Sequence, residues 1–458
     1  MGKKFFLLFA LLLVGIVSVG IGCKGLSAEE AASVRPVSLD YWTVYNDVDE
    51  LKKRAAEYKA LRPYVTVNIR QVRPEEFDKL FINALADDVA PDIISMHTRS
   101  LRNYLNKLSP MPQSVNVASV TVKGNYRKET IVTPLRIAMP SLAAVRSNYL
   151  QTVVDDIMVG GQIYGLPLSV DTLAIYYNKD LLDKAGIAEP PTAWGEFLEA
   201  SQAATNYNSE GAILQSGVAL GGVDNIQNAP DILAMFMMQN GIDMVKSGFV
   251  NFSKGLERPS SNHPALEALR FYADFAKETK EAYSWNQDEG DAFTEFTRGR
   301  SVFYFGFAYD YPRIQARAPQ MNLEVIPVPQ LNASAPGNVA NYWIETVTKK
   351  SGAPDEAWDF IRFISAEEKV KEYTDILKLP SPYRKHIKDQ QEDVILSAFT
   401  NHILTIDSWY RGRNYAAADR ALRDLVESYL LPYGQRDNPL QRDANLIINA
   451  GRIIQQTL

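Results

Sequence analysis

The chain has 458 residues, of which 46% are hydrophobic and 22% charged, and its formal net charge is -6 at pH 7. This length exceeds what one hydrophobic core usually serves, so two domains are expected in a folded protein. The acidic balance excludes a broad nucleic-acid-binding surface, which would need a basic patch. The single cysteine excludes an internal disulfide.

The amino-terminal segment has the pattern of an export signal. Two lysines precede an apolar run over residues 5–22, and Cys23 follows directly. The segment VGIGC resembles a bacterial lipobox, which implies that Cys23 is lipidated. An uncleaved membrane anchor is the alternative, because roughly 17 to 25 apolar residues span a bilayer. Either interpretation makes residues 1–23 the signal or anchor and 24–35 a short flexible linker, with the body outside the cytoplasmic membrane.

Strands and helices then alternate along the chain. Strands are predicted over residues 37–45, 65–69 and 90–94, and helices over 48–58 and 77–85. This βαβαβ order predicts a mostly parallel sheet with helices on both faces. Such sheets bind ligands beyond the carboxyl ends of their strands, where His97 follows the third strand.

The stretch from residue 163 to 200 reads IYGLPLSVDTLAIYYNKDLLDKAGIAEPPTAWGEFLEA. Residues 172–177 are apolar and aromatic, which predicts a buried strand. A short helix is predicted over residues 178–185, ended by Gly186 in the left-handed conformation. Thr192 is predicted to cap the helix that follows.

The rest of the chain is predicted to be rich in helices, with two further strands. The continuous apolar run SVFYFGF at residues 301–307 predicts a buried strand, and a helix is predicted before it over 291–297. Residues 341–348 predict the other strand. Pro354 begins a helix with one apolar face.

The pieces YGLP, DT, YYNKD and AG-PP-T-W within residues 163–200 resemble the middle of the maltose-binding-protein-like extracellular solute-binding proteins, a family of ABC transporter sugar-binding lipoproteins. The block NYWIETVTKKSGAPDEAWDFIRFIS is similar to a second motif of that family. The resemblance implies a periplasmic-binding-protein-like α/β fold with two discontinuous lobes, a hinge of three crossing segments and a ligand cleft between the lobes. Lobe I is expected to comprise residues 36–170 and 337–385, and lobe II residues 171–336 and 386–458.

The resemblance also implies where the chain crosses between the lobes. Crossings are expected near residues 170–174, near 336–343 and beyond Ser381. In the family, the position of Asp171 often contacts ligand; the alternative is a hinge residue that caps a turn. Trp343 lies in the second crossing, and core packing is its alternative role.

A cleft for a neutral sugar needs aromatic faces for the C–H side of the ring and polar side chains for its hydroxyls. Candidates occur at predicted strand ends and loops, each with structural packing as its alternative. The aromatic candidates are Trp42, Tyr45, Trp285, Tyr304, Tyr309, Trp343 and Trp409. The polar candidates are His97, Asp171, Asp224, Asn341 and Arg411.

Sequence motifs for catalysis and cofactor binding are absent. The chain contains no G-x-S-x-G, H-E-x-x-H or G-x-x-x-x-G-K, and the G-x-G-x-x-G at residues 20–25 lies in the export segment, not between a strand and a helix. Its four histidines are scattered, so neither a metal nor a cofactor is expected.

The leading hypothesis is a non-enzymatic, monomeric, membrane-tethered binding protein. It would capture a mono- or oligosaccharide by hinge closure and deliver it to an ABC import permease. One alternative is a secreted glycan-active hydrolase or lyase, because two of the 54 acidic residues could meet in the cleft. Another is the same fold with a polyamine or glycerol phosphate ligand, or with a sensory role.

Overall fold

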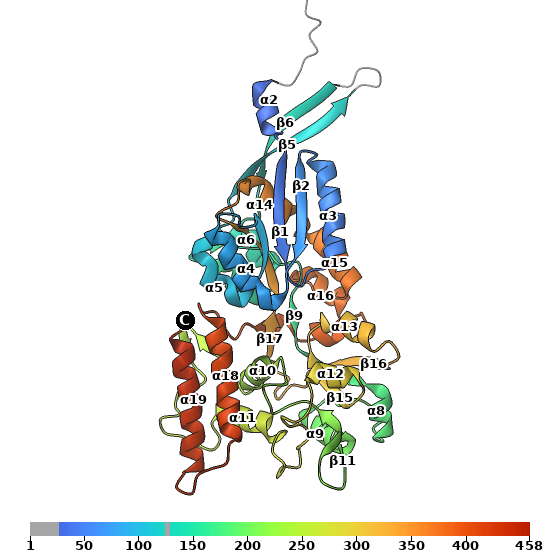
Figure 1. Cartoon of the computed structure of the whole chain (residues 1–458), viewed down its shortest axis with the longest axis vertical. Coiled ribbons are helices and arrows are strands. Elements are labelled where there is room, and N and C mark those ends of the chain that lie inside the picture. The colour runs from blue at the N-terminus through green and yellow to red at the C-terminus, as the bar shows by residue number, and fades with distance from the viewer. Residues whose placement is uncertain (1–26, 124–128) are drawn as a thin grey trace, which may run out of the picture.

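The computed structural model describes residues 27–123 and 129–458. Two α/β bodies lie end to end along the long axis of the molecule, with the hinge strands β9 (Asp171–Thr172) and β17 (Asn338–Asn341) between them (Figure 1). No helix in the described ranges is long and apolar enough to cross a membrane. Cys23 lies outside these ranges.

Each body is built around its own hydrophobic cluster. The first cluster draws on residues 39–170 and 340–406, and we call the body around it lobe I. The second draws on residues 173–339 and 398–454, and we call its body lobe II. Both lobes therefore contain segments that are far apart in the sequence.

Lobe I is centred on a five-stranded sheet of order β2-β1-β3-β18-β4. Its strands are β1 (Val37–Thr43), β2 (Val65–Gln71), β3 (Ile93–His97), β4 (Leu108–Ser109) and β18 (Trp343–Thr348). β1 is parallel to β2 and β3, whereas β18 is antiparallel to β3. The helices α3 (Val48–Leu61) and α4 (Pro74–Ala86) connect the parallel strands, so the βαβαβ prediction is confirmed.

The remaining lobe I elements surround this sheet. The helices are α5 (Leu101–Tyr104), α6 (Leu142–Asn148), α7 (Gln151–Ile157), α14 (Pro354–Ile364), α15 (Glu367–Leu377) and α16 (Arg384–Gln390). Short 3-10 turns η1 (Thr98–Ser100) and η2 (Leu105–Lys107) flank α5, and β7 (Met158–Val159) pairs with β8 (Gln162–Ile163). The helix predicted to begin at Pro354 is α14, whose buried side is apolar except for Asp359, which is paired with Arg62.

Lobe II is centred on a second five-stranded sheet, of order β11-β12-β15-β10-β16. Its strands are β10 (Ala174–Asn178), β11 (Asn206–Tyr207), β12 (Ile213–Val218), β15 (Ser301–Gly306) and β16 (Leu323–Pro327). Every residue of β15 is buried, as its continuous apolar run predicts.

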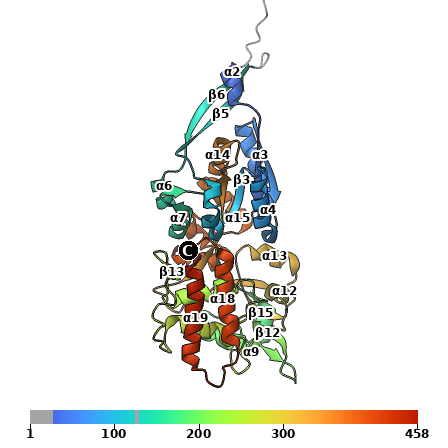
Figure 2. The ribbon, with the colours of Figure 1, turned by 60° about the vertical axis from the view of Figure 1, so that its left-hand side comes forward.

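The helices of lobe II are α8 (Lys179–Lys184), α9 (Trp194–Ala204), α10 (Ala229–Gln239), α11 (Pro264–Asp274), α12 (Ala292–Thr297), α13 (Asp310–Arg317), α17 (Leu396–Thr400), α18 (Tyr415–Leu430) and α19 (Pro439–Gln455). They pack on the lobe II sheet, as α9 does on β12, or on one another, as α10 does on α11. A small hairpin joins β13 (Val245–Lys246) to β14 (Phe249–Val250), and η3 (Ile403–Thr405) follows α17. The last two helices pack side by side along the outside of the lobe (Figure 2). Gly186 ends α8 with φ +81°, as predicted.

Three chain segments meet at the hinge and form their own sheet, of order β19-β17-β9. β17 runs antiparallel to β9 and parallel to β19 (Ile406–Asp407). The first two segments coincide with the expected crossings, and the third lies beyond Ser381. The predicted fold class, two α/β lobes with a three-segment hinge, is confirmed.

Two predicted strands are broken at this hinge. The strand expected over residues 172–177 divides at Leu173 into β9 and β10, and the one expected over 341–348 divides at Tyr342 into β17 and β18. At each break the chain leaves the hinge sheet and enters the sheet of a lobe. Neither break carries a glycine or a proline that would end a strand, so the sequence pattern could not reveal them.

Three other features differ from the predictions. The helix α9 has Ala193 as its N-cap, whereas Thr192 donates its N–H and hydroxyl to Glu196. Within the expected linker, Ser27 caps a short helix, α2 (Ala28–Ser33). This helix packs against a long hairpin, β5 (Ser114–Lys123) with β6 (Glu129–Ala138), which the sequence analysis did not predict and which projects away from lobe II (Figure 1).

Candidate ligand-binding cleft

A cavity of about 750 Å³ lies between the two lobes beside the hinge. Lobe I lines it with residues that follow β1 and β3 and with the first turn of α4. Lobe II lines it with the start of α10, the segment after β15 and the first half of α18. The cavity therefore lies at the carboxyl ends of parallel lobe I strands, where such sheets bind ligands.

Three aromatic side chains form a cluster at this cavity. The rings of Tyr45 and Trp343, both in lobe I, have centroids 4.3 Å apart. Tyr309 of lobe II lies 5.2 Å from Tyr45 and 6.1 Å from Trp343. Each ring is only partly buried, so this aromatic cluster offers apolar faces to the cavity and joins the lobes.

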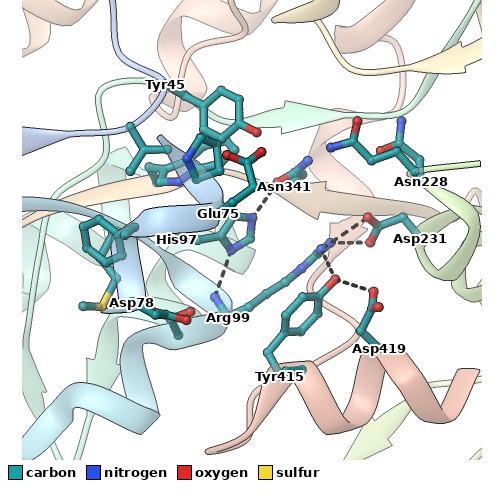
Figure 3. A pocket seen from close by; sticks show the side chains of 18 of the residues that line it. Tyr45, Glu75, Asp78, His97, Arg99, Asn228, Asp231, Asn341, Tyr415 and Asp419 are labelled. Carbon is teal, nitrogen blue, oxygen red and sulfur yellow. Dashed lines mark hydrogen bonds and ion pairs between the residues drawn. The ribbon is translucent and has the colours of Figure 1, made fainter. Parts of the chain in front are cut away.

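His97 and Asn341 form a polar pair next to the aromatic cluster (Figure 3). The Nδ1 of His97 accepts the N–H of Arg99 at 3.1 Å, so its Nε2–H donates to the Oδ1 of Asn341 at 2.6 Å. Burial lowers the pKa of His97 to about 3, and the positive charge of Arg99 acts in the same direction. The imidazole is therefore neutral, and it leaves the amide N–H groups of Asn341 facing the cavity.

An ion pair crosses the cleft from one lobe to the other. Arg99 extends from η1 of lobe I and makes a two-pronged contact with the carboxylate of Asp231, at the start of α10 in lobe II. Its Nη1 also donates to the hydroxyl of Tyr415 at 2.9 Å, and Asp231 accepts the indole N–H of Trp409 at 2.7 Å. Arg99 and Asp231 are both buried, so this interlobe ion pair is shielded from water.

The other arginines at the cavity are also paired with carboxylates. Arg423 donates to Asp419 at 2.8 Å, and Arg420 lies 2.6 Å from Asp424 on the same helix. Arg420 also contacts Glu427 at 3.1 Å. Among the described residues lining the cavity, every arginine therefore has an acidic partner.

The start of α4 brings two acidic side chains, Glu75 and Asp78, to the cavity rim (Figure 3). Asp78 accepts the hydroxyl of Tyr104 at 2.8 Å, and both Glu75 and Asp78 are exposed. The residues that remain available to a ligand are thus aromatic rings, amides and these rim carboxylates.

A model of the bacterial extracellular solute-binding proteins matches residues 53–397. The match includes most of the strands and helices of both lobes, together with two of the three hinge segments. The chain belongs to this family. As an extracellular solute-binding protein, it acts outside the cytoplasm.

Curated relatives are distant in sequence. A binding protein of Brucella abortus (strain 2308) is 24% identical over 50% of this chain and 53% of its own length, so the chain spans about half of that relative. The multiple sugar-binding protein of Streptococcus mutans is 19% identical over 80% of this chain and 79% of its own. Among solved structures, the GacH receptor of Streptomyces glaucescens superposes with a TM-score of 0.67 at 18% identity, covering 92% of this chain and 100% of the receptor.

The structure brings part of the predicted site of this solute-binding protein together. The predicted residues that line the cavity are Tyr45, His97, Tyr309, Asn341 and Trp343. They come from both lobes and from the hinge, and they include the whole aromatic cluster.

Four predicted aromatic residues do not line the cavity. Trp42 is buried in β1 beneath Arg70, and Trp285 is fully buried with its indole N–H on Asn225. Tyr304 and Trp409 belong to the lobe II core. The physical reason is the same in each case, since these large rings bury more apolar area inside a lobe than they could at the cleft. Trp409 nevertheless touches the site indirectly through the carboxylate of Asp231.

The predicted polar residues away from the cavity have structural contacts. Asp171 accepts the backbone N–H groups of Thr172, Ala308 and Tyr309, at 2.8, 2.9 and 3.2 Å. It therefore fixes the segment that carries Tyr309.

Arg411 and Asp224 occupy other positions. Arg411 lies 2.6 Å from the buried Asp156 and 2.5 Å from Asp407, so it ties lobe I to the third hinge segment. Asp224 is exposed on the lobe II surface and is not part of the cavity wall.

Several cavity residues were not predicted from the sequence. The main ones are Glu75, Asp78, Arg99, Asn228, Asp231 and Tyr415. Arg99 could have been found, because it follows His97 by two positions at a strand end. The lobe II residues carried no such signal, since α10 and α18 reach the cavity only through the packing of the two lobes.

Proposed function

We propose that this protein captures a neutral mono- or oligosaccharide between its lobes and delivers it to an ABC import permease. The observation that carries the proposal is the aromatic cluster, formed across the lobes by Tyr45, Trp343 and Tyr309 at the edge of the cavity. Aromatic faces suit the C–H side of a sugar ring, and the amide N–H groups of Asn341, whose Oδ1 is held by the neutral His97, suit its hydroxyls.

The size of the cavity supports this class of ligand. Its volume of about 750 Å³ lies within the roughly 300 to 1,000 Å³ typical of small-molecule sites. The multiple sugar-binding protein of Streptococcus mutans and the acarbose-bound GacH receptor also support it.

The charges at the cavity argue against other solutes. A phosphorylated ligand would need unpaired cations, but the lining arginines of the described chain are paired with Asp231, Asp419 and Asp424. A polyamine would need several free carboxylates, and of the four carboxylates among the described lining residues only Glu75 and Asp78 at the rim lack an arginine partner. A neutral polyhydroxylated ligand fits this balance best.

Hinge closure provides the mechanism. A ligand that contacts both lobes stabilises the closed form, whereas a ligand that contacts one lobe shifts no equilibrium. The hinge sheet lets the lobes rotate about three short segments, and Tyr45 and Tyr309 approach one another on closure. The permease would then recognise the closed form.

The protein is proposed to act without catalysis. Hydrolysis of a glycosidic bond requires a general acid and a second carboxylate on opposite sides of the bond. On lobe II, Asp231 and Asp419 are engaged by Arg99 and Arg423, which leaves no free carboxylate across the cavity from the α4 pair among the described lining residues. A tether through Cys23 and a monomeric state complete the proposal.

A thermal-shift panel of neutral saccharides, phosphorylated sugars and polyamines tests the ligand class. Ligand at 100 times its Kd should add about 2.7 kcal/mol to the free energy of unfolding. Stabilisation only by phosphorylated sugars or polyamines would refute the neutral ligand. Chromatography of the mixtures after incubation should show the saccharide intact, and appearance of shorter products would identify an enzyme.

The site is tested by Trp343→Ala, with Phe249→Ala as its matched control. Phe249 is 70% exposed on the surface of lobe II, away from the cavity. The Trp343 variant should lose about 2 kcal/mol or more of binding free energy, as large aromatic anchors do, while the control keeps its affinity.

A further inference from the structure

The Arg99 guanidinium is the only cationic group that lobe I places in the described cavity wall, and a lobe II carboxylate neutralises it. Asp231 contacts two of its nitrogens, and the rings of Tyr415 and Trp409 lie 5.0 and 5.6 Å from its carbon Cζ. The arginine is 6% exposed. A guanidinium in this setting requires a negative partner, because a buried charge without one is costly.

Asp231 is held in place for this task by two groups. The indole N–H of Trp409 donates to its Oδ1, and the residue lies in the first turn of α10, where the helix favours a negative charge. The carboxylate is thus fixed independently of any ligand. It occupies the position that an acidic ligand group would need in order to pair with Arg99.

We propose that Asp231 is a specificity-determining residue, which makes the cleft select neutral saccharides over saccharides that carry a carboxylate. This inference rests on the proposed function, because it concerns the ligand class of the same cavity. With Asp231 in place, a carboxylate on the ligand faces a guanidinium whose charge Asp231 already neutralises. The negative charge of Asp231 also repels it. A neutral hydroxyl meets no such repulsion.

The Asp231→Asn substitution isolates the charge from the shape. The amide oxygen in the place of Oδ1 can still accept from Trp409 and from one nitrogen of Arg99. The amide nitrogen takes the place of Oδ2, so the size and shape of the side chain are kept while one acceptor of Arg99 is lost. The guanidinium then keeps a net charge that only the ligand can balance.

The test compares matched saccharide pairs by calorimetric titration. Each pair consists of a neutral oligosaccharide and the oligosaccharide of the same length and linkage with its C6 alcohols oxidised to carboxylates. The wild type should prefer the neutral member. Asp231→Asn should bind the acidic member more tightly than the wild type does, by about tenfold or more, as expected for a new charged hydrogen-bonded contact.

Two further variants separate this effect from net charge. The double variant Asp231→Asn with Arg99→Met should lose the gain, because the cation is gone. Asp243→Asn makes the same change in net charge at a surface pair with Lys246 and should bind like the wild type. Melting temperatures establish that each variant is folded.

The outcomes distinguish the inference from the proposed function. An acidic-saccharide affinity of Asp231→Asn within about twofold of the wild type, well below the expected charged contact, would overturn the inference. Persistence of the gain in the double variant would also overturn it. If Asp231→Asn does not fold, Arg99→Met is compared with the wild type instead, and an unchanged neutral-to-acidic preference in that variant would overturn the inference. If the wild type binds no neutral saccharide, the proposed function fails instead, whatever the variants do.

Discussion

Replacing Arg99 with methionine should shift the ligand-free protein towards an open form. Arg99 belongs to lobe I, whereas its partners Asp231 and Tyr415 belong to lobe II. Methionine retains an unbranched apolar side chain but has no charge and no N–H donors. In the closed form the variant would also leave the carboxylate of Asp231 buried without its cation, so closure is disfavoured on both counts.

The size of the effect follows from the contacts that are lost. Hydrogen bonds to charged groups contribute about 1.5 to 3 kcal/mol each in the net. Because opening lets water solvate Asp231, the variant need not bear the full cost of a buried unpaired carboxylate, and the free energy of closure lost by the variant stays in about this range. The ratio of closed to open molecules should therefore fall by about tenfold to hundredfold. When the open form predominates, apparent ligand affinity falls by the same factor.

Small-angle X-ray scattering of ligand-free protein measures this shift through the radius of gyration. The matched control is Arg420→Met, since Arg420 lines the same cavity but pairs with Asp424 and Glu427 on its own helix. The Arg99 variant should be larger than the wild type, and the control should not. Equal radii for all three proteins, with unchanged affinity in the Arg99 variant, would refute the role of the interlobe ion pair in closure.

Three further predictions concern residues behind the cavity. Asp171→Asn places an N–H against the backbone N–H of Tyr309, which costs about 1 to 3 kcal/mol. Because Asp171 fixes the segment that carries Tyr309, calorimetry should show weaker ligand binding, and an unchanged affinity would contradict this role of Asp171. Burial raises the pKa of Glu345 to about 7, so the native state keeps a proton that the unfolded chain releases near pH 4.3. The stability contributed by this proton is present below pH 4.3 and is lost as pH rises to about 7, a loss of at most about 4 kcal/mol in the free energy of unfolding. Urea unfolding should show this loss in the wild type but not in Glu345→Gln, and parallel pH profiles of the two proteins would count against it. Arg411→Met leaves the buried Asp156 without its cation and should lower stability by about 3 kcal/mol, whereas an unchanged melting temperature would rule out that anchor.

The strand and helix pattern of lobe I could be predicted because its periodicity is local. Val65, Val67 and Ile69 alternate along β2, and Phe77 and Phe81 bury one face of α4. The hinge could not be predicted in this way. The residues on both sides of Leu173 are buried and no glycine or proline marks the break, so only the family resemblance indicated that the chain changes lobes there.

The candidate site could be predicted where it lies at strand ends. Tyr45 follows β1 and His97 ends β3, and both reach the cavity. Aromatic character alone did not separate the cleft from the core, since Trp285 is as suitable for stacking as Trp343 but lies inside lobe II. Asp231 could not be found at all, because its role depends on an arginine of the other lobe.

The cavity between the lobes is proposed to bind one neutral saccharide. Calorimetric titration of the wild type and Trp343→Ala with neutral oligosaccharides is the decisive measurement. We expect a single site per chain, a negative heat-capacity change from burial against the aromatic cluster, and much weaker binding by the variant. Binding of phosphorylated sugars or polyamines with no heat from any neutral saccharide would contradict it.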